Sequence, residues 1–274
     1  MIFDSNARTI KALSTLIFMV IKLFLLAWLA TSLFAMIAWL HYFIYRINCI
    51  IDVIWPLGIW LSGLVITWNT VPAIPFIWLH STLGIWSLRL ALYLFITRVA
   101  PQKQDPRYQN ISSNWKKSKL YGYFWNYQMQ AVLMMSLSAP FFLAHLIEIS
   151  PWSLACFGFM LLALCGESWS DYLLYRHQQN TTTSLCLLGP WKYSRHPNYF
   201  FDWLFWFALA CLVLPFNHGW LGLTSPLALY LIMNKITIPI SEKNSLQKRP
   251  KDYALYQKTT SVFFPTFQQK RHSS

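Results

Sequence analysis

Residues 189–199, Gly-Pro-Trp-Lys-Tyr-Ser-Arg-His-Pro-Asn-Tyr, concentrate side chains that can bind a charged ligand. Guanidinium and imidazole groups bind anionic oxygens, and an amide both donates and accepts hydrogen bonds. Pro197 indicates that a helix begins here, because proline suits the first turn of a helix. The free backbone N–H groups of that turn form a ready site for an anion. The polar side chains of this segment that we take as site candidates are Tyr193, Arg195, His196 and Asn198.

Five charged residues lie within or at the edge of apolar stretches: Asp52, Arg89, Glu167, Asp171 and Asp202. A lone charge near the centre of a bilayer costs about 3 kcal/mol, so such residues usually face the interior of a helix bundle and serve a function. The structural alternatives are that Asp52 caps a helix, that Arg89 pairs with one of the carboxylates, and that Glu167 and Asp171 only hold helices together. We keep all five as site candidates.

The spacing of these residues indicates that they share helical faces. Glu167, Asp171 and Tyr175 follow one another at intervals of four residues, so a continuous helix places them on one side. Asn198 and Asp202 are also four residues apart. The sequence therefore predicts two helices that present polar faces near the 189–199 segment. A large, partly anionic, hydrogen-bonding ligand would fit such a site.

The elements that carry these groups are predicted to be membrane helices. Of the 274 residues, 56% are hydrophobic, 18% aromatic and only 11% charged, whereas a soluble domain carries about 25% charged residues. We predict an all-α, polytopic transmembrane helical bundle of about seven spans, with an N-terminal segment 1–50 and a membrane domain 51–274. The apolar stretches that we expect to span the bilayer are 12–45, 51–70, 76–98, 130–149, 152–174, 198–215 and 220–240.

Two stretches do not fit a simple span. The first apolar stretch is too long for one ordinary span and short for two, and we predict one long, tilted helix. A tight helical hairpin is the alternative, and it would reverse the side of the N-terminus. The polar and aromatic segment 100–127, which includes Asp-Pro-Arg-Tyr at 105–108, is predicted to lie in the membrane interface.

The charge distribution predicts the orientation. The chain has 22 Lys and Arg against 9 Asp and Glu, a net charge of +13. Basic residues gather in 98–127, in 175–198 and after 241, and we expect these segments and the C-terminus to be cytoplasmic. No nucleic-acid-binding motif accompanies the charge, so we expect no nucleic-acid partner. The five cysteines show no paired spacing, and we expect neither a disulfide framework nor a metal site.

Segment 189–199 resembles the signature of the membrane-embedded steroid 5-alpha-reductase superfamily, and most of all a bacterial branch of it. The resemblance extends over about 50–265. It implies a seven-helix enzyme of the bacterial inner membrane. Such an enzyme uses NADPH to reduce a carbon–carbon double bond conjugated to a carbonyl, in a lipid-soluble substrate of steroid or isoprenoid type. Further pieces that agree in order are Asp52–Gly58, Trp86–Leu90, Asp105–Tyr108, Ser170–Tyr172, Arg249–Tyr253 and Phe264–Pro265.

The resemblance also implies residue roles. Asp171 and Asn198 match cofactor-binding positions, whereas Glu167 stands where the steroid enzymes have Asn. The Gln-Glu pair that polarises the substrate carbonyl in those enzymes is absent here, so the candidates for that catalytic task are Asp52, Arg89 and Tyr93. The residues expected to bind the cofactor are Glu167, Asp171, Tyr193, Arg195, His196, Asn198, Asp202, Tyr253 and Tyr256.

A second family stays open as an alternative. Isoprenylcysteine carboxyl methyltransferases, which use S-adenosylmethionine, carry a similar Tyr-Ser-Arg-His-Pro stretch and a later Glu before a Tyr-rich tail, which Glu242, Tyr253 and Tyr256 would supply. The longer N-terminal half and the Asn after His-Pro favour the reductase. Glu242 is otherwise interpreted as a solvated charge. A transporter or scaffold is less favoured, because the chain shows no inverted repeat. The sequence does not predict the oligomeric state.

Overall fold

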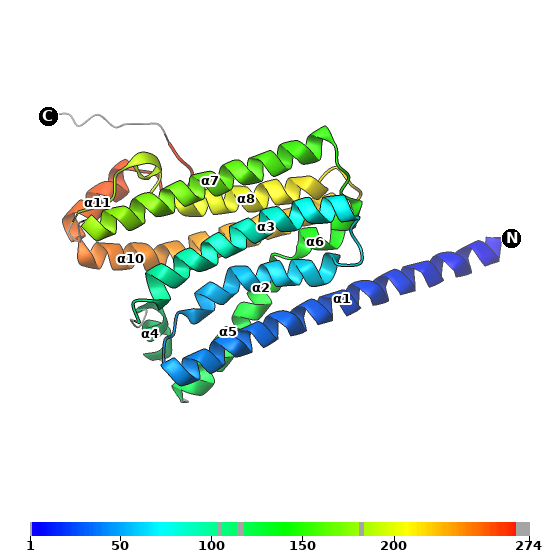
Figure 1. Ribbon diagram of the computed structural model, residues 1–274, viewed down its shortest axis with the longest axis horizontal. Helices are drawn as coiled ribbons and strands as arrows, with labels where there is room; N and C mark the ends of the chain where they lie inside the picture. The colour runs from blue at the N-terminus through cyan, green and yellow to red at the C-terminus, as the bar shows by residue number, and fades with distance from the viewer. Residues whose placement is uncertain (1, 103–105, 114, 116–117, 181–183, 267–274) are drawn as a thin grey trace. The chain divides into compact units, whose positions relative to one another are not determined.

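Figure 1 shows the computed structural model of the chain, which describes residues 2–102, 106–113, 115, 118–180 and 184–266. Within these ranges the regular elements are all helices, so the predicted all-α class is confirmed. The chain divides into two compact units, Met1–Ile147 and Glu148–Ser274. The boundary predicted at residue 50 lies inside the first unit and stays a prediction.

Six helical stretches among the described residues are long and apolar enough to cross a membrane, and a seventh apolar helix is shorter. The chain is therefore an integral, multi-pass membrane protein of the predicted type. The six stretches are Ile17–Tyr45, Ile50–Thr67, Ala73–Val99, Lys119–Leu146, Pro151–Asn180 and Gly219–Lys248, and the shorter helix is Pro197–Val213.

The first unit begins with one continuous helix, α1 (Ile2–Tyr45), so the single long helix is confirmed and the hairpin is excluded. α1 packs against α2 (Ile50–Thr67) and α5 (Lys119–Ser136) (Figure 1). Four buried side chains of α1 are small, which allows helix backbones to approach closely inside a membrane. They are Ala27, Thr31, Ala35 and Ala38.

Two hydrogen bonds between side chains join the apolar helices of the first unit. His80 on α3 (Ala73–Leu94) lies 2.7 Å from the Thr67 hydroxyl of α2, and Ser62 of α2 lies 2.9 Å from Ser138. All four side chains are buried. Such bonds contribute about 0.6 kcal/mol each within a membrane bundle. α3 then continues into a π-helical turn, η1 (Phe95–Val99).

The fourth span was predicted at 130–149, and this position is wrong by about three helical turns at its start. Ser118 accepts a hydrogen bond from the Tyr121 backbone and begins α5 eleven residues earlier. The helix ends before Ser138, and α6 (Ala139–Leu143) and the short turn η2 (Ala144–Leu146) follow. The sequence before residue 130 looks too polar for a membrane span. Part of that polarity comes from tyrosines that are buried inside the unit, so the start of the helix was predicted too late.

Those tyrosines bond inside the first unit. The Tyr127 hydroxyl donates to the backbone oxygen of Asn48 at 2.8 Å, and the Tyr123 hydroxyl donates to that of Tyr108 at 3.2 Å. Tyr108 lies on α4 (Pro106–Ser113), so these bonds fasten α4 and α5 to the start of α2. Asp105 of the predicted Asp-Pro-Arg-Tyr motif lies outside the described residues.

The second unit is built on two antiparallel helices, α7 (Pro151–Asn180) and α8 (Pro197–Val213). They approach closely at Gly166, where an added Cβ would lie 2.5 Å from the Phe201 ring. Continuous α7 confirms the predicted helical face. Glu167 and Asp171 on it are buried, whereas Tyr175 one turn further is exposed.

The chain then returns through three consecutive helical segments to the start of α8. They are α9 (Thr224–Ile232), a π-helical turn η5 (Met233–Thr237) and α10 (Ile238–Lys248), with the 3₁₀ turn η4 (Gly219–Leu223) before them. α11 (Pro250–Thr259) folds back from α10. The segment after it crosses the 189–199 segment, because the backbone of Arg195 donates to Ser261 at 2.9 Å and that of Thr266 donates to Tyr193 at 3.0 Å.

Candidate functional site

Segment 189–199 follows α7 in the chain and forms a short turn that leads into α8. Gly189 adopts a left-handed backbone conformation with φ +53° and starts a 3₁₀ turn, η3 (Gly189–Lys192). The indole of Trp191 on this turn donates to the backbone oxygen of Ser170 on α7 at 3.0 Å. His196 then occupies the N-cap position of α8, and Pro197 stands in its first turn, as predicted from the sequence.

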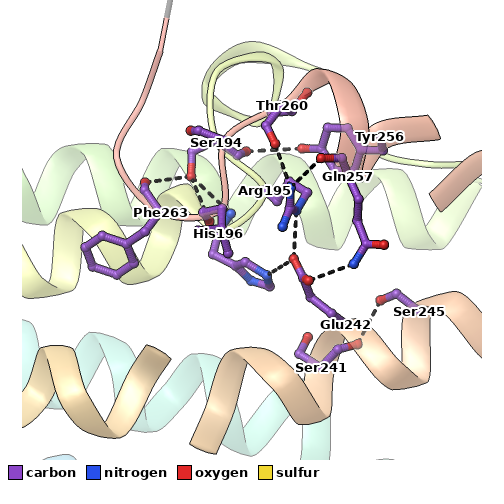
Figure 2. A network of polar contacts seen from close by, with 12 residues as sticks. Ser194, Arg195, His196, Ser241, Glu242, Ser245, Tyr256, Gln257, Thr260 and Phe263 are labelled. Carbon is purple, nitrogen blue, oxygen red and sulfur yellow. Dashed lines mark hydrogen bonds and ion pairs between the residues drawn. The ribbon is translucent and has the colours of Figure 1, made fainter. Parts of the chain in front are cut away.

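Glu242 of α10 lies at the centre of a polar network around this segment, which Figure 2 shows from close by. Its Oε1 accepts a hydrogen bond from Arg195 Nε at 2.7 Å and lies 3.2 Å from His196 Nε2. Its Oε2 accepts from Gln257 of α11 at 2.8 Å. The interpretation of Glu242 as a solvated charge is therefore wrong, since its side chain is only 13% exposed and joins three elements.

Arg195 connects the network to the end of the chain. Besides pairing with Glu242, its Nη1 donates to the backbone oxygens of Gln257 at 3.0 Å and Thr260 at 2.6 Å (Figure 2). A planar guanidinium can reach a carboxylate and two carbonyls at once, which a lysine ammonium cannot do with the same geometry. Arg195 therefore organises the site, and its predicted contact with the cofactor stays a prediction.

The tautomer of His196 follows from its partner. A carboxylate only accepts hydrogen bonds, so Nε2 must carry the hydrogen that faces Glu242. The ring also stacks on Tyr199, with centroids 5.4 Å apart and planes 5° from parallel. Burial lowers the pKa of His196, and Glu242 only partly opposes this effect. The residue is therefore neutral near pH 7, with the lone pair on Nδ1.

A second polar pair joins α7 to α8. Asn198 Nδ2 donates to Asp171 Oδ1 at 3.1 Å, which brings together the two residues that the family resemblance marks for the cofactor. Glu167 lies one turn before Asp171, and Asp202 lies one turn after Asn198. Because the helices are antiparallel, both continue the polar face in the same direction. All three carboxylates are buried at 6% exposure or less.

Two of the three predicted tyrosines, Tyr193 and Tyr256, form hydrogen bonds within the second unit. The backbone oxygen of Tyr193 accepts from the Ser261 hydroxyl at 3.0 Å. The Tyr256 hydroxyl bonds to the backbone oxygens of Trp191 and Ser194, the latter at 3.1 Å. Burial raises the pKa of both Tyr253 and Tyr256, so both are neutral phenols. Their predicted contacts with a cofactor stay predictions.

In the first unit, Asp52 has a partner that the sequence analysis did not propose. Its carboxylate forms an ion pair with Arg98 and accepts from the Tyr108 hydroxyl at 2.6 Å. Both carboxylate oxygens therefore have a partner within the first unit, so we do not assign Asp52 the role of the acid at the substrate. Arg89 and Tyr93 lie one turn apart on α3, and both are half-buried.

Sequence reasoning did not include Glu242, Gln257 or Ser194 in the site. Glu242 lies 47 residues after Arg195, and no helical periodicity relates positions so far apart. The usable signal was the similarity to the methyltransferases, in which a later Glu precedes a Tyr-rich tail. Across the part of the chain that the structure describes, no three His, Cys, Asp or Glu side chains lie close enough to hold a metal ion.

Gly189→Ala is expected to destabilise the second unit by about 2 kcal/mol. Alanine disfavours the left-handed region by about 1–2 kcal/mol, and its Cβ would lie 2.7 Å from Leu173. Thermal unfolding of the detergent-solubilised chain measures the effect. Gly158→Ala on α7 is the matched control, since a Cβ there meets nothing within 4 Å and alanine favours a helix. Equal stability of the two variants would contradict the structural role of Gly189.

Acidification is expected to destabilise the second unit through His196. Its pKa is lowered in the folded state, so the unfolded chain binds more protons as the pH falls below about 6.5. The contribution is fully present above that pH and decreases below it. His196→Gln retains a donor for Glu242 but does not titrate. The unfolding temperature of the parent chain is expected to fall more between pH 7 and pH 5 than that of His196→Gln. If both fall equally, this assignment is refuted.

The fold and the site together define a membrane-embedded helical protein with a buried polar network beneath an Arg-His-Pro turn. Comparison with protein families matches residues 38–260 to DUF1295, described as a protein of unknown function, and the chain belongs to that family. This family is associated with steroid 5-alpha-reductase-like proteins. Searches of curated proteins and of solved structures found no match.

Proposed function

We propose that the chain is an NADPH-dependent reductase of a carbon–carbon double bond conjugated to a carbonyl, in a lipid-soluble substrate. The observation that carries the proposal is the hydrogen bond between buried Asp171 and half-buried Asn198, which lies beside the Arg-His-Pro turn and next to the buried carboxylates Glu167 and Asp202. Buried polar groups in membrane helices usually serve function. Membership in a family associated with steroid 5-alpha-reductase-like proteins supports the same activity.

The donors and acceptors fit different parts of the nucleotide. A carboxylate accepts from hydroxyl and amide donors but repels phosphate, so Asp171 suits the ribose hydroxyls or the carboxamide rather than the phosphates. The positive end of α8, which begins at Pro197, suits a phosphate. The exposed ammonium of Lys192 on η3 adds positive charge near that turn. Arg195 and Glu242 hold the turn in place.

When bound, NADPH would supply a hydride for the β-carbon of the substrate. The residues of this chain would then stabilise the enolate oxygen that forms, which is the usual electrostatic task at such a site. Arg89 and Tyr93 are our candidates, because each can donate a hydrogen bond. Asp52 is less suited, since its two carboxylate oxygens are already bonded to Arg98 and Tyr108.

Binding of NADPH to the solubilised full chain tests the proposal. Asn198→Ala and Asp171→Ala are each expected to weaken binding by about tenfold or more, because a lost hydrogen bond to a charged group costs about 1.5–3 kcal/mol. Asn180→Ala, an exposed amide at the end of α7, is the control and is expected to bind as the parent does. No measurable affinity of the parent, or equal affinity of all variants, would refute the proposal.

One observation favours a second candidate, an S-adenosylmethionine-dependent membrane methyltransferase. Glu242 joins Arg195 and His196, and these are the residue types that the isoprenylcysteine carboxyl methyltransferases share with this chain. A zwitterionic cofactor would suit a site that contains both carboxylates and a guanidinium. Parallel titration with S-adenosylmethionine distinguishes the two, since we expect it to bind at least tenfold more weakly than NADPH.

A further inference from the structure

One end of the second unit carries much more exposed positive than negative charge. The end is defined by the bonds that join α7, η3, α10 and α11 around the Arg-His-Pro turn. Among the described residues of these four elements, Asp252 is the one exposed acid, because the other carboxylates are buried or engaged in the network. The exposed cations are Arg176, Lys192, Lys243, Lys248, Lys251 and Lys258.

α11 presents two different faces. Tyr253 and Tyr256 are buried against the unit. Lys251, Leu255 and Lys258 are exposed and follow one another at intervals of four and three residues, so they share the opposite face. Leu255 is 53% exposed between the two lysines. We call these three residues the basic face of α11. An apolar side chain flanked by cations is typical of a helix that lies in a membrane interface.

Neighbouring elements indicate the depth of α11 relative to the boundary between membrane and water. Trp169 and Tyr172 on α7 are exposed directly before Arg176, and Trp and Tyr gather at the boundary between membrane and water. α10 ends the membrane-spanning stretch Gly219–Lys248, and α11 begins two residues later. Figure 1 shows α11 at the end of α10. The basic face therefore lies where a span leaves the apolar core.

We propose that the basic face of α11 binds the headgroups of anionic phospholipids. Its two lysines match the negative charge, and Leu255 is placed to insert beside the first carbons of the acyl chains. A lysine near an anionic membrane surface strengthens binding about fivefold, so the pair corresponds to roughly thirtyfold at low salt. The attraction is screened as ionic strength rises. This inference does not depend on the reductase proposal.

The test compares three double variants of the full chain in nanodiscs that contain equal amounts of phosphatidylglycerol and phosphatidylcholine. After extraction in mild detergent, mass spectrometry measures the ratio of the two lipids that remain bound. K251Q/K258Q is expected to lower the ratio about tenfold or more relative to the parent. K119Q/K235Q removes the same charge from exposed lysines on two other elements, α5 and η5, and is expected to leave the ratio unchanged. K251R/K258R retains the charge and is expected to retain the ratio.

Four results would overturn the proposal. The first is a parent chain that retains both lipids equally. The second is a ratio for K251Q/K258Q equal to that of K119Q/K235Q. The third is a ratio for K251R/K258R as low as that of K251Q/K258Q. The fourth is release of phosphatidylglycerol by about 1 mM inorganic pyrophosphate at constant ionic strength, which would make the face a site for soluble anions.

Discussion

Glu242→Ala is expected to cost the second unit about 3 kcal/mol or more of its unfolding free energy and to abolish cofactor binding. Removing one partner of a buried ion pair leaves an uncompensated charge, which costs about 3–5 kcal/mol. Here the remaining charge is Arg195, whose side chain is 10% exposed. His196 and Gln257 lose their acceptor at the same time. Thermal unfolding in detergent and a cofactor titration measure the two effects.

The matched control is Asp252→Asn, which removes an exposed acid from the first turn of α11. An exposed charge contributes little, so its stability is expected to stay within about 0.5 kcal/mol of the parent. Glu242→Gln should fall between, because its amide can accept from Arg195 but presents hydrogens to another donor. If Glu242→Ala unfolds at the same temperature as Asp252→Asn, the ion-pair network does not organise this unit.

The second large effect is expected from a chain that ends after Thr260. Such a truncation removes Phe263, which is only 2% exposed and packs edge-on against Phe200, Trp203 and Tyr230. Loss of a buried phenylalanine side chain costs about 3–5 kcal/mol. The truncation also removes the backbone partners of Arg195 and Tyr193 and the acceptor of the Ser194 hydroxyl. Unfolding temperature and susceptibility to protease measure the loss.

A chain that ends after Thr266 is the control for this truncation. It retains Ser261, Phe263 and the backbone N–H of Thr266, together with every one of these bonds. We expect it to unfold at the same temperature as the full chain. If both truncated chains are equally unstable, the contacts of residues 261–266 do not explain the requirement. If both match the parent, these contacts contribute nothing measurable to the unit.

Local signals predicted much of the second unit. Pro197 marked the first turn of α8, and intervals of four residues predicted the polar face of α7. Each of these features depends on neighbours within one or two turns, which a sequence shows directly. The family resemblance marked Asp171 and Asn198 as cofactor-binding positions, and the structure adds the hydrogen bond between them.

Contacts between distant segments could not be predicted in the same way. Arg195 and Glu242 are 47 residues apart, and Asp52 and Arg98 are 46 apart. The basic residue that pairs with a given carboxylate depends on how the helices pack. Because the chain contains several candidate basic residues, the sequence alone does not predict the ion pair. α5 was placed too late for a related reason, since the buried hydroxyls of Tyr123 and Tyr127 look like interfacial residues until their backbone partners are known.

A single competition measurement tests the claim that the polar network around the Arg-His-Pro turn supports a nucleotide site. The solubilised full chain is incubated with NADPH and S-adenosylmethionine at equal concentration, washed, and analysed by mass spectrometry for what it retains. We expect retained NADPH with the parent chain and with Asp252→Asn, and none with Glu242→Ala. Retention of S-adenosylmethionine instead would contradict the reductase, and retention of neither by the parent would contradict the nucleotide site itself.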